Sequence, residues 1–417
     1  MRLMVRMLAV LACGLLLWAL AQGQGRLVYN SYNGDPLARA SDQRIVALFK
    51  QRYPGIQVTH TIVAHEDFKQ AIRTYLASSR PPDVLTWFAG ERMRYFAERG
   101  LVADITDLWR KEGWERIFPK GFQALSKTGD RYTFLPTSYY WWAVYYRKDI
   151  FQRLGLAVPK TWKEFVAVCD RLNAAGLTPI AIGTKFLWPA AGWFDYLNLR
   201  VNGPQFHLAL MDGKVAYTDP RVRRVFDYWK ELLDHKCFLE NPASYDWQDA
   251  ANLMVQGKAA MYLIGDFIRD QYPDDREEKE LDFFRFPIIN PSVPLAEEAP
   301  TDGYFIPAKA PNMENAKLFL SFLASKEVME LAVKEFKRLV PRNDVDPKLY
   351  PAYIQKGLKE IIEPAAYITQ FYDRDTDPEM ANKGMNGFVQ FMANPGQIDA
   401  ILRSLEEERA RIFKDNR

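Results

Sequence analysis

The chain has 417 residues and nearly balanced charge, with 55 lysines and arginines against 52 aspartates and glutamates. This balance and the lack of a long basic run argue against a nucleic-acid partner. The length exceeds what one hydrophobic core usually supports, so we expect two domains.

The N-terminal segment, residues 1–21, has the features of a secretory signal peptide. Arg2 and Arg6 precede an apolar stretch, Met7–Leu20. Ala19-Leu20-Ala21 supplies the small residues of a cleavage site. We therefore expect cleavage after Ala21 and an exported protein, periplasmic or extracellular. A lipoprotein anchored through Cys13 is the alternative, although only about six apolar residues precede that cysteine. No other segment is long and apolar enough to span a membrane.

Short β-rich runs alternate with amphipathic helical stretches at the start of the mature chain. We expect strands at Arg26–Tyr29, Ile56–Val63 and Val84–Trp87, and helices at Ser41–Tyr53 and Glu66–Ser78. This order predicts a parallel sheet covered by helices, with ligands at the carboxyl ends of the strands.

The middle of the chain begins with aromatic strands and continues as helices. One long strand is expected to run from the turn at residues 128–130 through Pro136, and another at Ala143–Asp149. Thr161, with Glu164 three residues later, forms a capping box that predicts a helix start. The segment Gly257–Phe267 is typical of a helix end, a short buried strand and a turn opening toward a cleft.

The last third of the chain is mainly helical. Pro287–Pro300 is proline-rich and acidic, which predicts a linker, and Tyr304–Pro307 is a candidate strand. We expect a helix at Asn315–Glu335 and a helical tail at Lys348–Arg417, broken at Tyr372–Pro378. We find no internal repeat and no low-complexity segment.

Motifs for metal, nucleotide or nucleophile chemistry are missing from the sequence. The four histidines form no H-E-x-x-H pair, and there is no C-x-x-C, Walker or G-x-S-x-G motif. Residues 373–377 begin like a calcium loop, but Pro378 and Gly384 stand where glycine and a bidentate glutamate are needed. We expect no metal and no cofactor, and the lack of motifs weakens an enzymatic interpretation.

Two cysteines, Cys169 and Cys237, remain after cleavage. An exported protein could join them in a disulfide. Cys169 lies on an apolar helical face, where a buried, inert thiol is the commoner state. Both interpretations stay open.

Aromatic residues are abundant and indicate a class of ligand. Sugars present C–H faces that stack on aromatic rings, and hydroxyls that need polar partners. Most aromatic side chains in a chain of this size nevertheless belong to the core. The candidates are Trp87, Phe88, Tyr139, Tyr140, Trp141, Trp142, Trp188, Trp193, Trp247 and Tyr304.

Several segments, in shared order and spacing over the mature chain, resemble the extracellular solute-binding proteins of bacterial ABC importers, the sugar-binding group that includes maltose-binding protein. They are Tyr53–Val58, Pro82-Asp83-Val84, Gly100–Ile105, Tyr145–Phe151, Pro159–Phe165 and Gly257–Met261. The resemblance implies an α/β, two-lobed periplasmic-binding-protein fold of type II, with the ligand in the interlobe cleft and closure by a hinge. By analogy, lobe 1 would take residues 26–136 and 301–340, and lobe 2 residues 137–300 and 341–417.

The resemblance also implies ligand-binding positions. Trp87 would stack on the ligand, and Glu91 and Arg92 would grip hydroxyls. Phe267 would take the place of a second stacking residue, and Asp266 would accept hydrogen bonds from sugar hydroxyls. Either Trp188 or Trp193 would form a platform, the other belonging to the core. The further candidates at strand ends, crossings and aromatic runs are Tyr32, Asn33, Glu66, Tyr140, Trp141, Trp247, Asp302, Gly303, Tyr304 and Arg342.

The expected function is therefore that of a sugar receptor for an ABC importer. It would bind a mono- or oligosaccharide as a monomer and deliver it to a membrane permease, with no reaction performed on the ligand. One alternative keeps the fold but changes the solute to a polyamine, an anion or a metal ion. Another is a secreted carbohydrate-active enzyme.

Overall fold

The computed structural model describes residues 25–414, so the expected signal peptide, its cleavage site after Ala21 and the alternative anchor Cys13 lie outside the described residues. The described chain divides into two compact units. Unit 1 contains the residues up to Trp87, Phe96–Thr137 and Asp302–Leu349. Unit 2 contains Phe88–Tyr95, Ser138–Thr301 and Tyr350–Arg417.

Apart from one-residue shifts at Thr137 and Thr301, the chain divides differently from the expected lobes at two places. Phe88–Tyr95 belongs to unit 2, where Arg92 pairs with Asp373 at 2.7 Å. Residues 341–349 belong to unit 1, where the Asn343 amide donates to the carbonyl of Ile117 at 3.0 Å. Neither contact could be read from the local sequence, because the partners are far apart in the chain.

Unit 1 is built on a five-stranded sheet with the order β2-β1-β3-β12-β6. The strands are β1 (Gly25–Ser31), β2 (Ile56–Ile62), β3 (Val84–Phe88), β6 (Leu135–Tyr139) and β12 (Thr301–Phe305). β1 pairs in parallel with both β2 and β3, which confirms the predicted parallel arrangement. The expected long strand before Pro136 is wrong, because Arg131–Tyr132 (β5) turns back to pair with Lys127–Thr128 (β4).

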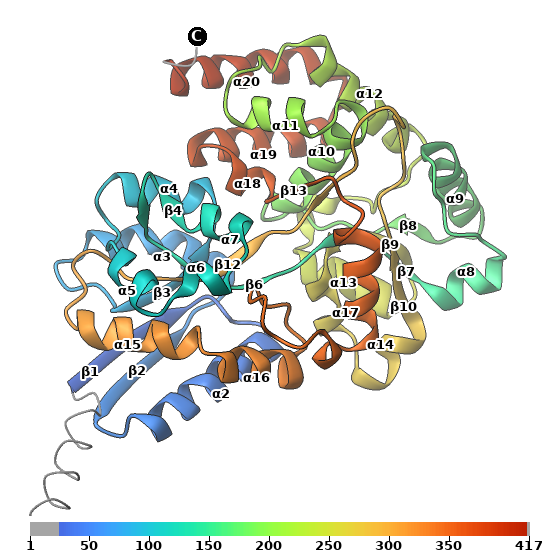
Figure 1. Cartoon of the computed structure of the whole chain (residues 1–417). Helices are drawn as coiled ribbons and strands as arrows, with labels where there is room; N and C mark the ends of the chain where they lie inside the picture. Colours follow the sequence, from blue (N-terminus) through green and yellow to red (C-terminus); the bar gives the residue numbers. More distant parts are fainter. Residues whose placement is uncertain (1–24, 415–417) are drawn as a thin grey trace, which may run out of the picture. The chain divides into compact units, whose positions relative to one another are not determined.

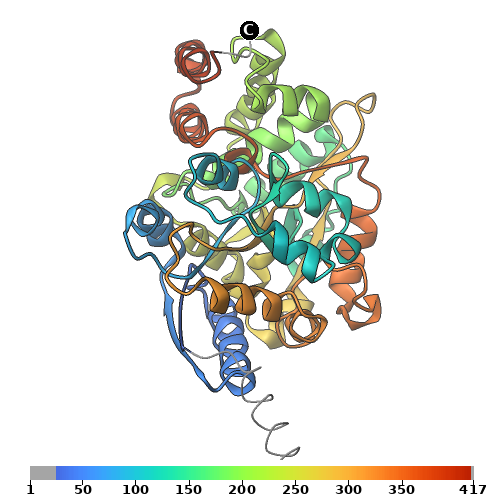
Figure 2. The same cartoon turned by 60° about the vertical axis from the view of Figure 1, so that its left-hand side comes forward.

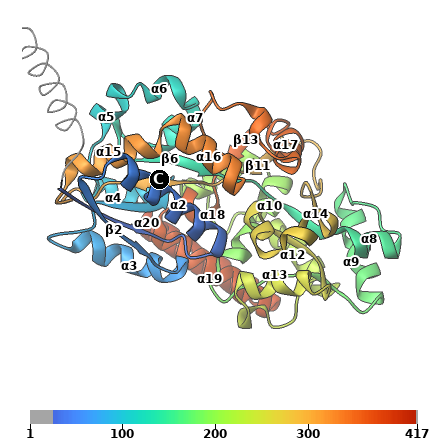
Figure 3. The same cartoon turned by 90° about the horizontal axis from the view of Figure 1, so that it is seen from below.

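Helices cover both faces of strands β1 and β2. α2 (Pro36–Arg52), α15 (Met313–Leu323) and α16 (Lys326–Phe336) pack together, and α3 (His65–Ala77) lies on the other side of the strands (Figure 3). The single helix expected at Asn315–Glu335 is wrong, because Ser325 caps a new helix by accepting a bond from the amide of Val328. The short helices of unit 1 are α5 (Thr106–Lys111), α6 (Trp114–Ile117) and α7 (Lys120–Leu125), whereas most of α4 (Glu91–Glu98) belongs to unit 2.

Unit 2 contains a four-stranded sheet with the order β10-β7-β9-β8 (Figure 1). β7 (Trp142–Arg147) pairs antiparallel with β10 (Leu281–Phe284) and with β9 (Ala259–Gly265), and β8 (Thr178–Ile180) runs parallel to β9. Every residue of β9 is buried, as expected for the apolar run that precedes the Gly-Asp-Phe turn.

The helices of unit 2 include the predicted capping box and a fully buried core helix. Thr161 and Glu164 exchange the two expected hydrogen bonds at the start of α9 (Trp162–Ala174), so this prediction is confirmed. All residues of α10 (Trp188–Val201) are buried. The others are α8 (Lys148–Leu154), α11 (Pro204–Met211), α12 (Pro220–Asp234), α13 (Trp247–Val255), α14 (Asp274–Glu280), α17 (Ala352–Gly357), α18 (Tyr372–Asp375), α19 (Pro378–Ala393) and α20 (Ile398–Ile412).

Helix packing explains why α10 is apolar on all sides. It contacts α12 and α19, and α19 in turn lies beside α20 as a helix pair that Figure 2 shows nearly end-on. A helix surrounded in this way has no solvent-facing stripe.

The acidic stretch Pro287–Pro300, expected to be a linker, is exposed or half-buried over residues 288–295 but ends in a buried strand. It contains β11 (Ala296–Glu298), which pairs in parallel with β13 (Tyr367–Thr369). Glu297 is fully buried and receives a 2.6 Å hydrogen bond from Arg200. The prediction fails because the compensating arginine comes from α10, far from the acid in sequence.

Candidate functional site

Four aromatic side chains of unit 2 meet where separate elements begin or end, and we term them the aromatic cluster. Tyr140 follows β6, Trp188 opens α10, Trp247 opens α13, and Phe267 lies just after β9. The Phe267 ring centroid is 4.9 Å from that of Trp247, 5.3 Å from that of Tyr140 and 6.2 Å from that of Trp188. These are distances of direct ring packing.

The aromatic cluster is partly accessible. Trp188 and Trp247 are each 9% exposed, whereas Tyr140 and Phe267 are half-buried. Gly265 precedes the turn, and a Cβ there would overlap the Phe267 ring and lie 2.9 Å from the Tyr140 ring. Glycine is therefore required for these rings to approach the backbone.

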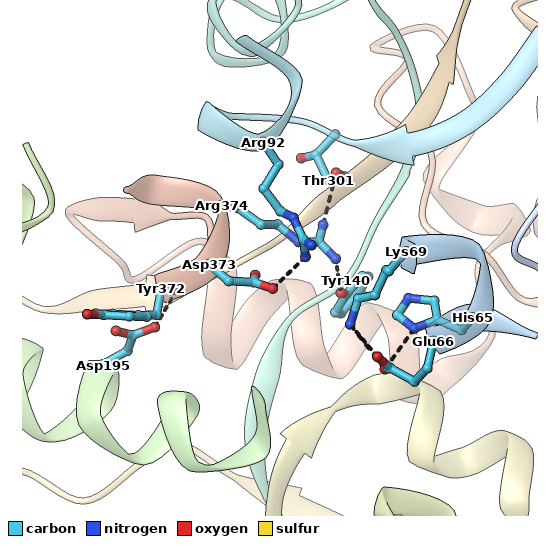
Figure 4. Close-up of polar contacts among 10 residues, drawn as sticks. All are labelled: His65, Glu66, Lys69, Arg92, Tyr140, Asp195, Thr301, Tyr372, Asp373 and Arg374. Atoms are coloured by element: carbon cyan, nitrogen blue, oxygen red, sulfur yellow. Dashed lines mark hydrogen bonds and ion pairs between the residues drawn. The ribbon is translucent and has the colours of Figure 1, made fainter. Parts of the chain in front are cut away.

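Arg374 is the polar partner of Tyr140, the member of the aromatic cluster that Figure 4 shows. It is almost fully buried, and its Nη2 donates to the Tyr140 hydroxyl at 2.9 Å while Nη1 donates to the Thr301 carbonyl at 3.0 Å. Its guanidinium carbon lies 4.4 Å from the ring centroid of Phe88. Asp266, half-buried beside Phe267, adds a carboxylate.

Glu91 and Arg92, which the resemblance implies would grip hydroxyls, each form an ion pair with another residue. Arg92 Nη1 binds the carboxylate of Asp373 at 2.7 Å (Figure 4), and Glu91 pairs with Arg94 one helical turn later. Arg92 also lies over the ring of Phe88, at 5.0 Å. Both expected residues thus have partners within unit 2.

Unit 1 carries a polar cluster at the start of α3, made of His65, Glu66 and Lys69 (Figure 4). Lys69 Nζ lies 3.0 and 2.9 Å from the two carboxylate oxygens of Glu66, and His65 Nδ1 lies 3.2 Å from one of them. Burial alone would raise the pKa of Glu66, but the His65 hydrogen bond and the Lys69 charge outweigh it and lower the pKa to about 2. Burial, together with Lys69, lowers the pKa of His65.

Tyr32 and Trp87 pack next to this polar cluster but are themselves buried. The Tyr32 ring lies 5.1 Å from that of His65, and its hydroxyl donates to the Trp87 carbonyl at 3.3 Å. Trp87 is 2% exposed, with its ring 6.3 Å from that of Phe68 and 5.8 Å from that of Phe96. The expected stacking residue therefore fills the interior of unit 1.

Asn33 is bound to a buried aspartate. Its Nδ2 donates to Asp42 Oδ1 at 2.8 Å, and Asp42 Oδ2 accepts from the Tyr29 hydroxyl at 3.0 Å and from the Ser31 hydroxyl. Asp42 thus fixes the chain as it leaves β1. Because the serine donates to the carboxylate rather than to a histidine, this group lacks the hydrogen bond of a catalytic triad.

Other expected site residues lie in the interiors of their units. Trp141 packs on Phe283 with ring centroids 5.6 Å apart, and Trp193 on Phe238 at 4.9 Å. Of the pair Trp188 and Trp193, Trp188 belongs to the aromatic cluster and Trp193 to the core of unit 2.

The candidates expected where the chain crosses between the lobes also lie within unit 1; they are Asp302, Gly303, Tyr304 and Arg342. A Cβ on Gly303 would collide with the backbone of Leu135, so this glycine permits close strand packing. Tyr304 is buried against Tyr29, while Asp302 is half-buried. Arg342 binds Asp344 at 2.7 Å and the carbonyl of Ala324.

Sequence reasoning missed Lys69, Asp373 and Arg374 as candidates. Lys69 had a readable signal, since it follows Glu66 by three residues on one face of a helix. The other two were seen only as part of a failed calcium loop, and nothing local indicates that they meet Arg92 and Tyr140.

Within residues 25–414, no group of histidine, cysteine, aspartate and glutamate side chains is arranged to hold a metal ion. In the same part of the chain, no helix combines the length and apolarity needed to cross a membrane.

Curated proteins similar to this chain include an extracellular and a periplasmic binding protein. The chain is 25% identical over 321 residues to an uncharacterised ABC transporter extracellular-binding protein of Pyrococcus horikoshii, covering 75% of this chain and 71% of the relative. It is 24% identical to a probable sugar-binding periplasmic protein of Mesorhizobium japonicum, covering 70% and 69%.

Two solved structures of solute-binding proteins are similar to this chain in fold. The bacterial solute receptor AcbH, which has an exclusive preference for β-D-galactopyranose, is 34% identical with a TM-score of 0.88, covering 94% of this chain and 100% of AcbH. Maltose-bound MalE3 of T. maritima, 18% identical with a TM-score of 0.80, covers 93% and 100%. The predicted two-lobed, type II solute-binding-protein fold is thereby confirmed. Residues 34–330 match the bacterial extracellular solute-binding protein family, and the chain belongs to that family.

Proposed function

We propose that the chain is the sugar receptor of an ABC importer, which captures a mono- or oligosaccharide and delivers it to a membrane permease. The aromatic cluster of unit 2 carries this proposal, because the half-buried rings of Tyr140 and Phe267, backed by the buried Trp188 and Trp247, offer a surface on which a sugar C–H face can stack. That the ligand lies between the lobes and that a hinge closes them stay predictions from the resemblance.

Polar groups in each unit suit sugar hydroxyls. In unit 2, Asp266 would accept hydrogen bonds and Arg374 would donate them. In unit 1, Glu66 is ionised at neutral pH and Lys69 is a donor beside it. Hydrogen bonds to such charged groups are stronger than those between neutral partners.

The charge arrangement favours an uncharged ligand. Lys69 is paired with Glu66 at 2.9 Å, and Arg92 with Asp373 at 2.7 Å. Because Lys69 and Arg92 each face a carboxylate, these two cations offer little additional attraction to a phosphate or a carboxylate ligand. This supports a neutral sugar over the alternative of an anion.

The similarity to AcbH suggests the first ligand to test. At 34% identity over 94% of this chain, AcbH is a receptor whose preference is for β-D-galactopyranose. We therefore propose a galactose-like monosaccharide as the leading candidate among sugars.

The remaining parts of the proposal concern location and chemistry. We propose that the mature protein acts outside the cytoplasm as a monomer, without a cofactor, and performs no reaction on the sugar. A turnover assay with oligosaccharides tests the last point: product that disappears when one acid is removed would contradict it and support a secreted enzyme.

A thermal-shift screen of residues 22–417 tests the proposed ligand class. The panel contains D-galactose, D-glucose, maltose and xylo-oligosaccharides, with spermidine, phosphate and divalent metal ions as controls. A ligand far above its Kd stabilises by a few kcal/mol through mass action, which raises Tm by several degrees. A selective shift with a sugar is expected, whereas a shift with a control ligand alone would discard the sugar.

A further inference from the structure

Unit 2 contains two buried cysteines that sugar binding does not use. Cys169 lies in α9, and Cys237 lies shortly after the end of α12. Both are fully buried, and both are thiols in this structure. Their elements are distant in sequence, so only the fold brings them near each other.

Three hydrogen bonds hold α9 against the turn that contains Cys237. The carboxylate of Asp170 lies 2.7 Å from His235 Nδ1, and Asn173 Nδ2 donates to the carbonyls of His235 at 2.8 Å and Lys236 at 3.3 Å. Asn173 follows Cys169 by one helical turn on the same face. Lys236 directly precedes Cys237, so these bonds hold Cys237 near the face of α9 that carries Cys169, and a side-chain hydrogen bond joins the two thiols.

The backbone of Cys237 is fixed on both sides. Its amide donates to the Leu232 carbonyl at 2.9 Å, and its carbonyl accepts from the Ile180 amide at 2.9 Å. Lys236 adopts a left-handed conformation with φ of 51°, which turns the chain sharply after α12. Cys237 is therefore held between α12 and β8, next to α9.

The chemical environment keeps these thiols unreactive toward solvent once the unit has folded. Burial, together with the neighbouring Cys237 thiol, raises the pKa of the Cys169 thiol well above its ordinary value. A thiolate is the attacking species in disulfide exchange, so oxidation has to take place while the chain folds.

We propose that Cys169 and Cys237 form an intramolecular disulfide when the chain folds in an oxidising compartment, an inference that rests on the proposed export. One cysteine, as a thiolate, attacks a disulfide-bonded oxidant to give a mixed disulfide, and the second displaces the oxidant. Two S–H bonds are lost and one S–S bond forms. The oxidant's S–S bond breaks, and its two sulfurs take up the two electrons and the two protons that the cysteines lose, so it leaves as two thiols. Such a bond closes a long loop, the case in which the chain-entropy model gives the largest stabilisation.

Alkylation and mass spectrometry test this proposal directly. The full-length chain is expressed in a bacterium with a periplasm, purified, denatured and treated with iodoacetamide without a reductant. We expect neither cysteine to be alkylated until a reductant is added, after which both are. Alkylation of one or both cysteines without reductant, in protein cleaved after Ala21, would overturn the disulfide.

The same sample separates this proposal from the proposed function. Processed protein that binds a sugar but carries two free thiols would overturn only the disulfide. If the signal peptide is retained, export has failed, and refolding of the reduced chain in glutathione buffer decides the disulfide by the same alkylation assay.

A stability measurement provides an independent readout. We expect reductant, added before refolding, to lower the Tm of the wild type by several degrees, and not to change that of the variant Cys169→Ala/Cys237→Ala. Equal Tm values for wild-type protein refolded with and without reductant would contradict the proposed bond.

Discussion

Arg374 donates a 2.9 Å hydrogen bond to the hydroxyl of Tyr140, although the two residues are far apart in the chain. The same guanidinium bonds the Thr301 carbonyl and stacks on Phe88. Tyr140 in turn contacts Phe267 with ring centroids 5.3 Å apart. Arg374 thereby orients one edge of the aromatic cluster and presents a cation beside it.

The first prediction concerns Arg374→Lys. Lysine keeps the charge but cannot bond two acceptors in one plane or stack flat on Phe88. We expect sugar affinity to fall about tenfold, or roughly 1.4 kcal/mol, together with a lower Tm. Titration calorimetry and scanning calorimetry measure the two effects. Arg411→Lys, at an exposed ion pair, is the matched control and should change neither. Unchanged affinity in Arg374→Lys would remove this residue from the site.

The second prediction concerns Phe267→Ala. Phe267 is half-buried and contacts the rings of Tyr140, Trp188 and Trp247, so its loss opens the centre of the aromatic cluster. We expect sugar affinity to weaken by about 1–3 kcal/mol, the effect of removing an aromatic anchor. The variant should retain the wild-type circular dichroism spectrum. Tyr367→Ala, which removes an exposed ring from β13, serves as the control and should bind normally.

The third prediction concerns Trp87, for which the resemblance suggested a loss of affinity in a folded variant. Because Trp87 is 2% exposed and packs on Phe68 and Phe96, Trp87→Ala should lower the free energy of unfolding by about 3–5 kcal/mol. Urea denaturation followed by fluorescence measures this change. A variant as stable as the wild type, with weaker sugar binding, would restore the stacking role.

The fourth prediction is a pH dependence of stability that arises in unit 2. Asp195 and Glu298 are fully buried neighbours. Burial, together with the adjacent acids, raises the pKa of Glu298 well above its ordinary value, and burial raises the pKa of Asp195 to about 8. In the unfolded chain both lose their protons near pH 4. The folded state therefore holds more protons above pH 4, and its stability should decrease as the pH rises from about 4 to 8.

Scanning calorimetry across this pH range checks the prediction. Glu298→Gln removes one titrating carboxyl while keeping its shape, and should flatten the decrease in Tm between pH 5 and 8. Glu335→Gln, at an exposed ion pair, is the control and should leave the slope unchanged. A wild-type Tm that rises steadily over this range would contradict the raised pKa values.

The sequence predicted the parts of the fold that depend on neighbours in the chain. The strands and helices up to Phe88 follow from periodicity, and the capping box of Thr161 and Glu164 is read from two residues three apart. The helix break at Ser325 was missed because apolar residues continue at helical spacing on both sides of it.

Long-range partners could not be predicted. Glu297 was expected to lie in an acidic linker but is buried. Its partner Arg200 lies in α10, so the local sequence does not show that the acid is paired. Likewise, Asp373 and Arg374 acquire their roles only through Arg92 and Tyr140. An acid can be buried when an oppositely charged residue pairs with it, and the local sequence does not show a partner that comes from a distant part of the chain.

The most direct test of the central claim is titration calorimetry of residues 22–417 with D-galactose and, in parallel, with maltose, phosphate and spermidine. A sugar receptor should give saturable heat with at least one of the two sugars, and Phe267→Ala should weaken that binding. Saturable heat with phosphate or spermidine, and none with either sugar, would contradict the assignment of a sugar as the ligand.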